Sequence, residues 1–102
     1  MGINVCWEDE RGNKLGEEIG DPQNLLAHAL PRITDADSKC LPFIDPYGDT
    51  LFNYLQRPAL ISELEVLQRH LSGDTERQHV GKVLDLLRRE PQLRAYVRFI
   101  GD

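Results

Sequence analysis

The sequence predicts an α+β fold: a small antiparallel sheet, built from an N-terminal hairpin and a C-terminal strand, with three to four helices packed on one face. Apolar residues alternate near both ends of the chain, and two long helical patterns lie between these segments. The 102 residues suit a single domain over residues 1–102, and a hydrophobic fraction of 40% is ordinary for a globular core.

Residues 2–8 predict the first strand, because an apolar side chain occupies every second position from Ile3 to Trp7. The polar, glycine-containing segment 9–13 predicts a hairpin turn. Residues 14–19 predict a weak return strand at the edge of the sheet, because a glycine interrupts it and few of its positions are apolar.

The next part of the chain predicts one short helix and a loop. Asp21 followed by Pro22 is typical of a helix start, and Pro31 should end that helix. Residues 31–39 are polar and predict a loop, and residues 40–44 predict a short extended segment.

The stretch FIDPYGDTLFNYLQ, residues 43–56, predicts a turn followed by a helix. Residues 45–48 have turn chemistry, because proline fixes φ at the second place and glycine tolerates a positive φ. Asp49 or Thr50 can then cap a helix whose apolar residues begin at Leu51 with helical spacing.

Two long helices are predicted after this stretch. Leucines recur on one helical stripe through residues 59–71, and Gly73 is a typical helix terminator. A second helix should start at Asp74 or Thr75, with a capping box at Thr75, and end before Pro91. The short connection predicts an antiparallel helical hairpin.

Residues 93–100 show the clearest alternation in the chain and predict the last strand. This strand should pair with residues 2–8, because the return strand alone is too poor to complete a sheet. Glu8 should then oppose Arg94 or Arg98 on the outer face.

The distribution of charge excludes some classes of partner. Residues 1–50 hold ten acidic and four basic side chains, whereas residues 51–102 hold seven and eight, for a net charge of −5. An acidic surface disfavours nucleic acid and leaves room for a basic protein partner. No apolar run approaches the ~20 residues that span a bilayer, and no secretory signal is recognisable, so we expect a cytosolic protein that binds no membrane.

Catalytic and metal-site patterns are weak. Asp45, Asp49 and Asn53 are oxygen ligands spaced by four, but the turn between them does not place them on one helical face, and the rhythm of a calcium loop is missing. The alternative function is a small metal-dependent or hydrolytic enzyme that uses Asp45 and Asp49, with His28 as a further group. We expect no cofactor, no metal and no catalytic residue.

The cysteines give no assembled nucleophile. Cys6 and Cys40 should both be reduced in a cytosolic domain, and Cys6 in a strand pattern should behave as a small apolar side chain. His70 and His79 fall on or near polar helix faces, with no base placed beside either cysteine.

A binding surface is the remaining candidate. Phe43, Tyr47 and Tyr54 lie beside Asp45 and Asp49, and tyrosine next to charge is typical of binding hot spots. In the other interpretation, Phe43 and Tyr54 fill the core and Tyr47 covers it. The predicted binding residues are Phe43, Asp45, Tyr47 and Asp49.

The segments FIDPYGDT (residues 43–50), Phe52-Asn53 and the closing FIGD (residues 99–102) resemble a group of small bacterial proteins of unassigned function. The resemblance extends over nearly the whole chain and implies no activity, cofactor or site residue. Nine arginines against three lysines fit a GC-rich bacterial coding sequence.

These observations predict a non-catalytic protein-interaction module in the bacterial cytosol. One specific form is an immunity- or antitoxin-like protein that masks a basic toxin. A homodimer through Arg94, Tyr96 and Arg98 on the outer sheet face is a further hypothesis. A diffuse acidic contribution to binding would come from Glu8, Glu10, Glu17 and Glu18.

Overall fold

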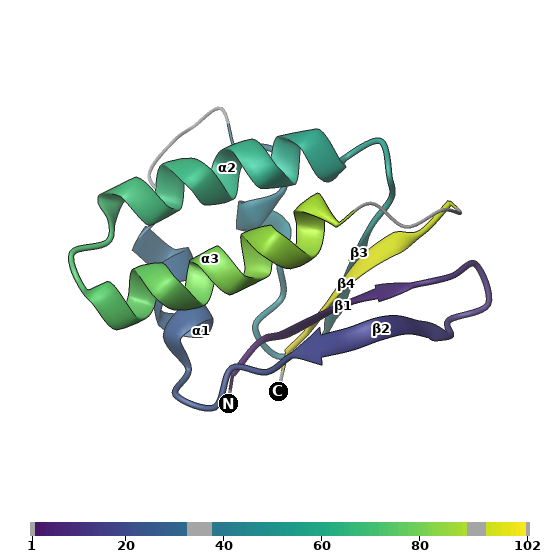
Figure 1. The fold of residues 1–102 in the computed structure, drawn as a ribbon, viewed down its shortest axis with the longest axis horizontal. Coiled ribbons are helices and arrows are strands. Elements are labelled where there is room, and N and C mark those ends of the chain that lie inside the picture. Colours follow the sequence, from purple (N-terminus) through teal and green to yellow (C-terminus); the bar gives the residue numbers. More distant parts are fainter. Residues whose placement is uncertain (1, 33–37, 90–93, 102) are drawn as a thin grey trace.

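A computed structural model describes residues 2–32, 38–89 and 94–101 and shows an α+β fold (Figure 1). The strands form one antiparallel sheet in the order β2-β1-β4-β3, and the helices pack on one of its faces. The predicted fold class is therefore confirmed. The elements are β1 (Asn4–Glu8), β2 (Lys14–Ile19), α1 (Leu25–Ala29), β3 (Asp49–Phe52), α2 (Arg57–His70), α3 (Asp74–Arg88) and β4 (Tyr96–Ile100), with short 3-10 helices at Leu30–Arg32 and Leu41–Phe43.

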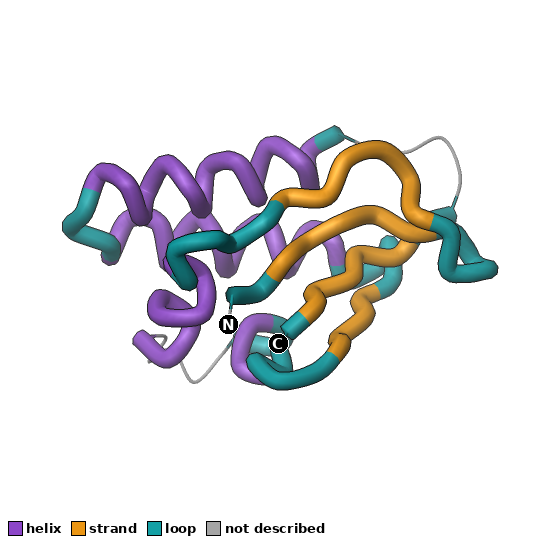
Figure 2. Tube along the Cα trace, turned by 90° about the horizontal axis from the view of Figure 1, so that it is seen from below, coloured by secondary structure: helices purple, strands orange, loops and turns teal. Residues whose placement is uncertain are grey.

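The sheet is built around β1, which pairs with β2 on one side and with β4 on the other, as the alternating patterns predict (Figure 2). Val5 is opposite Ile19 and Trp7 is opposite Leu15, so two steps along β1 correspond to four along β2. This irregularity is a bulge, and Gly16 within it has a φ of 78°.

The core lies between the inner face of the sheet and the helical hairpin. Val5 and Trp7 of β1 are buried there with Val97 and Phe99 of β4. The indole Nε1 of Trp7 donates a 2.8 Å hydrogen bond to the carbonyl oxygen of Leu86, so the buried polar group of the ring is satisfied. The leucine stripe of α2 closes the core from the other side with Leu60, Leu64 and Leu67.

The hairpin of α2 and α3 is confirmed, but the predicted cap of α3 is wrong. The N-cap residue is Gly73, and no side chain makes a capping hydrogen bond there. Asp74 and Glu76 lie in the first turn instead, where their negative charge is favourable to the helix dipole.

Two predictions for the middle of the chain are wrong. Residues 49–52 form the strand β3, not a helix start, because β4 offers a second edge on which Thr50 pairs with Phe99 and Phe52 with Val97. The rings of Phe52 and Phe99 meet edge to face with centroids 5.7 Å apart. The segment predicted to be extended contains the 3-10 helix Leu41–Phe43.

The helix expected directly after Asp21 begins later, at Leu25. Asp21 still serves the start of this helix, because its Oδ1 accepts a 3.2 Å hydrogen bond from the Leu26 N–H and its Oδ2 one of 3.2 Å from the Ala27 N–H. Oδ2 also accepts a 3.0 Å bond from the N–H of Ile3. The carboxylate thus ties the start of β1 to α1.

Candidate functional site

The exposed large apolar side chains that the structure describes are confined to one stretch of the chain. Among the described residues, all of them fall within residues 43–55, which we call the 43–55 surface. The interpretation that buries Phe43 and Tyr54 under Tyr47 is therefore wrong. The exposed fractions are Phe43 71%, Tyr47 75%, Leu51 51%, Tyr54 42% and Leu55 72%.

The turn before β3 is held by its own polar groups. Asp45 Oδ1 accepts a 2.9 Å hydrogen bond from the Tyr47 N–H, and Thr50 Oγ1 accepts one of 2.9 Å from the Asp45 N–H. These bonds are typical of turn aspartates. Asp45 therefore organises the turn while remaining exposed to solvent.

The end of β4 fixes the position of this turn. The N–H of Gly101 donates a 2.8 Å hydrogen bond to the carbonyl oxygen of Gly48. A Cβ added to Gly101 would lie 2.5 Å from the carbonyl carbon of Pro46, so only glycine fits without displacing the backbone. Tyr47 thus projects from a turn that the sheet supports.

The strand β3 is an edge of the sheet and presents main-chain groups to a partner. In an antiparallel pair of strands, every second residue directs its N–H and C=O groups to the partner strand. The bond between Gly101 and Gly48 shows that Gly48 does so, and Thr50 and Phe52 therefore direct their main-chain groups toward β4. The N–H and C=O groups of Asp49 and Leu51 consequently point to the open edge.

The predicted binding residue Asp49 has a structural role. Its carboxylate is ion-paired with Arg98, whose Nη1 also contacts Glu8 at 2.8 Å. The hydrogen bonds that Arg98 donates to Asp49 and Glu8 raise the pKa of Arg98 above its usual range. Tyr96, and neither Arg94 nor Arg98, is directly opposite Glu8, so the ion pair of Glu8 with Arg98 is a diagonal contact. Arg94 lies over the Tyr54 ring, 5.4 Å from its centroid.

Two of the acidic side chains expected to contribute to binding lie away from this surface. Glu17 and Glu18 belong to β2, at the opposite edge of the sheet from β3. Each is already paired, Glu17 with Arg89 at 2.8 Å and Glu18 with Lys14 at 2.9 Å.

The metal-site and nucleophile candidates are not brought together. Within residues 2–32, 38–89 and 94–101, no group of three or more His, Cys, Asp or Glu side chains could hold a metal ion. Cys6 and Cys40 are free and buried, and burial raises the pKa of both thiols, which disfavours the reactive thiolate. His28 is exposed and joins no such group among the described residues.

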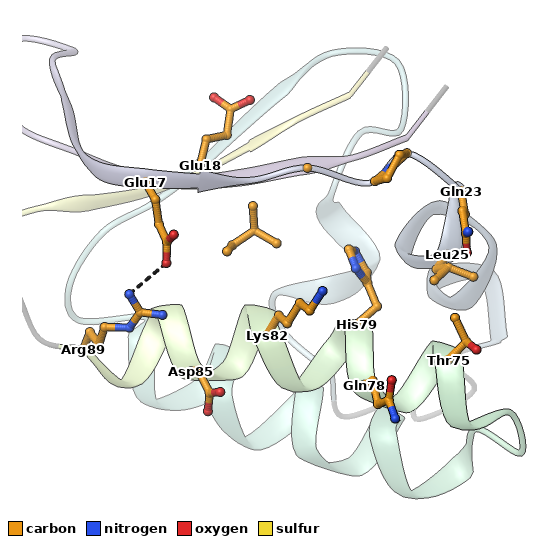
Figure 3. Close-up of a pocket in the computed structure, with 13 residues that line it drawn as sticks. Glu17, Glu18, Gln23, Leu25, Thr75, Gln78, His79, Lys82, Asp85 and Arg89 are labelled. Carbon is orange, nitrogen blue, oxygen red and sulfur yellow. Dashed lines mark hydrogen bonds and ion pairs between the residues drawn. The ribbon is translucent and has the colours of Figure 1, made fainter.

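A groove that no sequence pattern indicates lies between β2 and α3 (Figure 3). Its volume of about 580 Å³ is within the range of small-molecule sites. His79 lines the groove and is buried, which corrects the expectation of a polar helix face. The side chains that meet here are far apart in sequence, so no local motif could have revealed them.

In the part of the chain that the structure describes, no helix is long and apolar enough to cross a membrane. Comparison with protein-family models, with curated proteins and with solved structures gives no match, so the geometry above is the basis for function.

Proposed function

We propose that this protein is a non-catalytic protein-interaction module of the bacterial cytosol, and that it binds its partner through the 43–55 surface. The observation that carries the proposal is that, within residues 2–32, 38–89 and 94–101, the exposed large apolar side chains are confined to this surface. Clustered exposed apolar groups beside polar ones are typical of interaction sites.

The strand β3 suggests how the partner binds. The outward N–H and C=O groups of Asp49 and Leu51 can pair with an extended segment, which adds a strand to the sheet. Leu51 and Tyr47 would supply the side-chain contacts beside that strand, since both are more than half exposed. Main-chain pairing would then give affinity, and these side chains would give specificity.

The partner segment should carry a basic residue. Asp45 is exposed beside Tyr47 and makes no ion pair with any residue that the structure describes. A net charge of −5 also favours encounter with a basic protein. An immunity- or antitoxin-like protein that masks a basic toxin is the specific form that these charges favour.

Two variants of Leu51 separate strand addition from side-chain contact. Leu51→Ala removes the side chain and keeps the N–H, whereas Leu51→Pro also removes the outward N–H and leaves the pairing with β4 intact. Once the partner is identified by pull-down and purified, we expect Leu51→Pro to bind about three- to tenfold more weakly than Leu51→Ala, the worth of one hydrogen bond.

Tyr47→Ala should weaken the same complex by about 1 kcal/mol or more, the rough threshold of a hot spot. Lys14→Ala, on the opposite edge of the sheet, is the matched control and should bind like the wild type. Equal affinities for all variants, with each shown to be folded by circular dichroism, would contradict the proposal. Concentration-dependent sedimentation that is lost in Leu51→Pro would identify a second copy of this chain as the partner.

A further inference from the structure

The groove lies between α3 and β2, whose pairing with β1 contains a bulge. Glu17 points toward α3, whereas Glu18 points to the other side of the strand (Figure 3). Ile19, two residues after Glu17, packs against the hydrophobic core. Glu17 occupies a position at which an apolar side chain would pack on α3. Its ion pair with Arg89 connects β2 to the end of α3 instead. Ile19 leaves an apolar patch inside the groove.

The charged side chains that line the groove differ in whether they have an ion-pair partner. Glu17 is paired with Arg89, Glu18 with Lys14, and Asp85 lies 3.9 Å from Arg88. Lys82 also lines the groove, and no described residue forms an ion pair with it. Lys82 is therefore a groove cation without an ion-pair partner among the described residues, and a charge-assisted hydrogen bond from it favours an anionic group beside it.

His79 is the second group of the groove wall that can donate a hydrogen bond to an anion. His79 is only 8% exposed. Its Nε2 makes no hydrogen bond, although Asp21 Oδ1 is 3.3 Å away. Buried polar groups are nearly always hydrogen-bonded in proteins. The unsatisfied Nε2 is buried against Asp21 and does not face the groove, so Nδ1 is the ring nitrogen that remains for a ligand. The amino group of Lys82, one turn along α3, points toward His79 (Figure 3).

We propose that the groove binds a small organic anion, whose carboxylate or phosphate group lies between Lys82 and His79 while its remainder contacts Ile19 and Leu25. A protonated imidazole donates from both ring nitrogens, so His79 can serve Asp21 and the anion together. Asp21 itself already accepts three backbone N–H groups. The site lies at the β2 edge, away from β3, and is independent of protein binding there.

The ligand should also change the titration of His79. Burial lowers the pKa of His79, Asp21 raises it and Lys82 lowers it. A bound anion favours the protonated ring and offsets the effect of Lys82, so binding must raise the pKa. By linkage, the anion should bind more tightly at lower pH.

The test is a titration of the whole chain with sodium phosphate and with sodium acetate, monitored by the ring-proton NMR signal of His79. Sodium chloride at equal ionic strength is the reference. We expect a saturable shift with at least one probe and a higher titration midpoint for His79. Phosphate alone, acetate alone or both would support the site and assign its anionic group.

Lys82→Gln should weaken the saturable binding by about tenfold or more, as expected for one lost charge-assisted hydrogen bond. Lys39→Gln makes the same change of charge outside the groove and should bind like the wild type. Shifts that are linear with both probes, or equal in Lys82→Gln and the wild type, would overturn the proposal.

Discussion

At the scale of single residues, Asp21 is the buried carboxylate that holds several segments of the fold together. It is 4% exposed, and its two oxygens accept the N–H groups of Ile3, Leu26 and Ala27. A buried carboxylate of this kind stabilises a fold only while its partners remain in place. Asp21 therefore couples the start of β1, the start of α1 and, through His79, the helix α3.

We predict that Asp21→Ala lowers the free energy of unfolding by about 3 kcal/mol, because it leaves buried N–H donors without an acceptor. Urea denaturation monitored by circular dichroism measures the effect. Asp85→Ala removes an exposed carboxylate from α3 and should change stability by no more than about 0.5 kcal/mol. Equal, small losses for both variants would show that Asp21 is dispensable.

A pH dependence is predicted at His79. Because burial lowers its pKa in the folded state, the unfolded chain binds more protons, and folding stability must fall as pH falls through the unfolded histidine value of about 6.5. The free energy of unfolding of wild type and His79→Gln, compared between about pH 7.5 and about pH 5.5, isolates this effect.

The wild type should lose more stability than His79→Gln over this pH range. His70→Gln, an exposed site on α2, should retain the full wild-type dependence. A parallel pH dependence in wild type and His79→Gln would exclude His79 as its source.

At the scale of elements, β3 shows where local signals mislead. Asp49 and Thr50 are good capping residues, and the apolar residues from Leu51 onward have helical spacing, so the sequence favours a helix. Residues 49–52 nevertheless form a strand on the free edge of β4. This pairing buries Phe52 against Phe99 and satisfies main-chain groups of both strands, which a helix would not do. The turn chemistry of residues 45–48 could be predicted, but the conformation of residues 49–52 depends on a strand distant in sequence.

The contact between Gly101 and the turn gives an element-scale prediction. Gly101→Ala should cost about 1–3 kcal/mol of stability and also weaken partner binding, because its Cβ would displace the backbone of Asp45 and Pro46. Gly20→Ala is the matched control, since its Cβ would meet no atom closer than 3.9 Å. Urea denaturation and the binding assay together test this prediction, and equal behaviour of the two variants would contradict it.

At the scale of the whole molecule, the chain carries two candidate surfaces at opposite edges of one sheet. The order β2-β1-β4-β3 places the groove at one edge and the 43–55 surface at the other. The alternating patterns near the chain ends were sufficient to predict that β1 pairs with β4, because each has one clearly apolar face. Leu93, assigned to that last strand, lies outside the described residues.

The two surfaces differ in how far sequence could reveal them. Tyr47 and Asp45 were identified because aromatic and acidic side chains adjoin in one short stretch. The groove could not be predicted, because side chains of β2 such as Glu17 and side chains of α3 such as His79 come together only when α3 packs beneath β2, and no local periodicity encodes that packing. Exposure of Phe43 was likewise decided by tertiary packing, since an aromatic residue is as compatible with a core as with a surface.

Amide hydrogen exchange of Asp49 and Leu51, with and without the bound partner, tests the central claim most directly. Both amides point to the open edge of β3, so they should exchange quickly in the free protein and become protected in the complex. Thr50 and Phe52, whose amides already pair with β4, should change little. If a partner binds and the amides of Asp49 and Leu51 remain unprotected, strand addition at this edge is wrong.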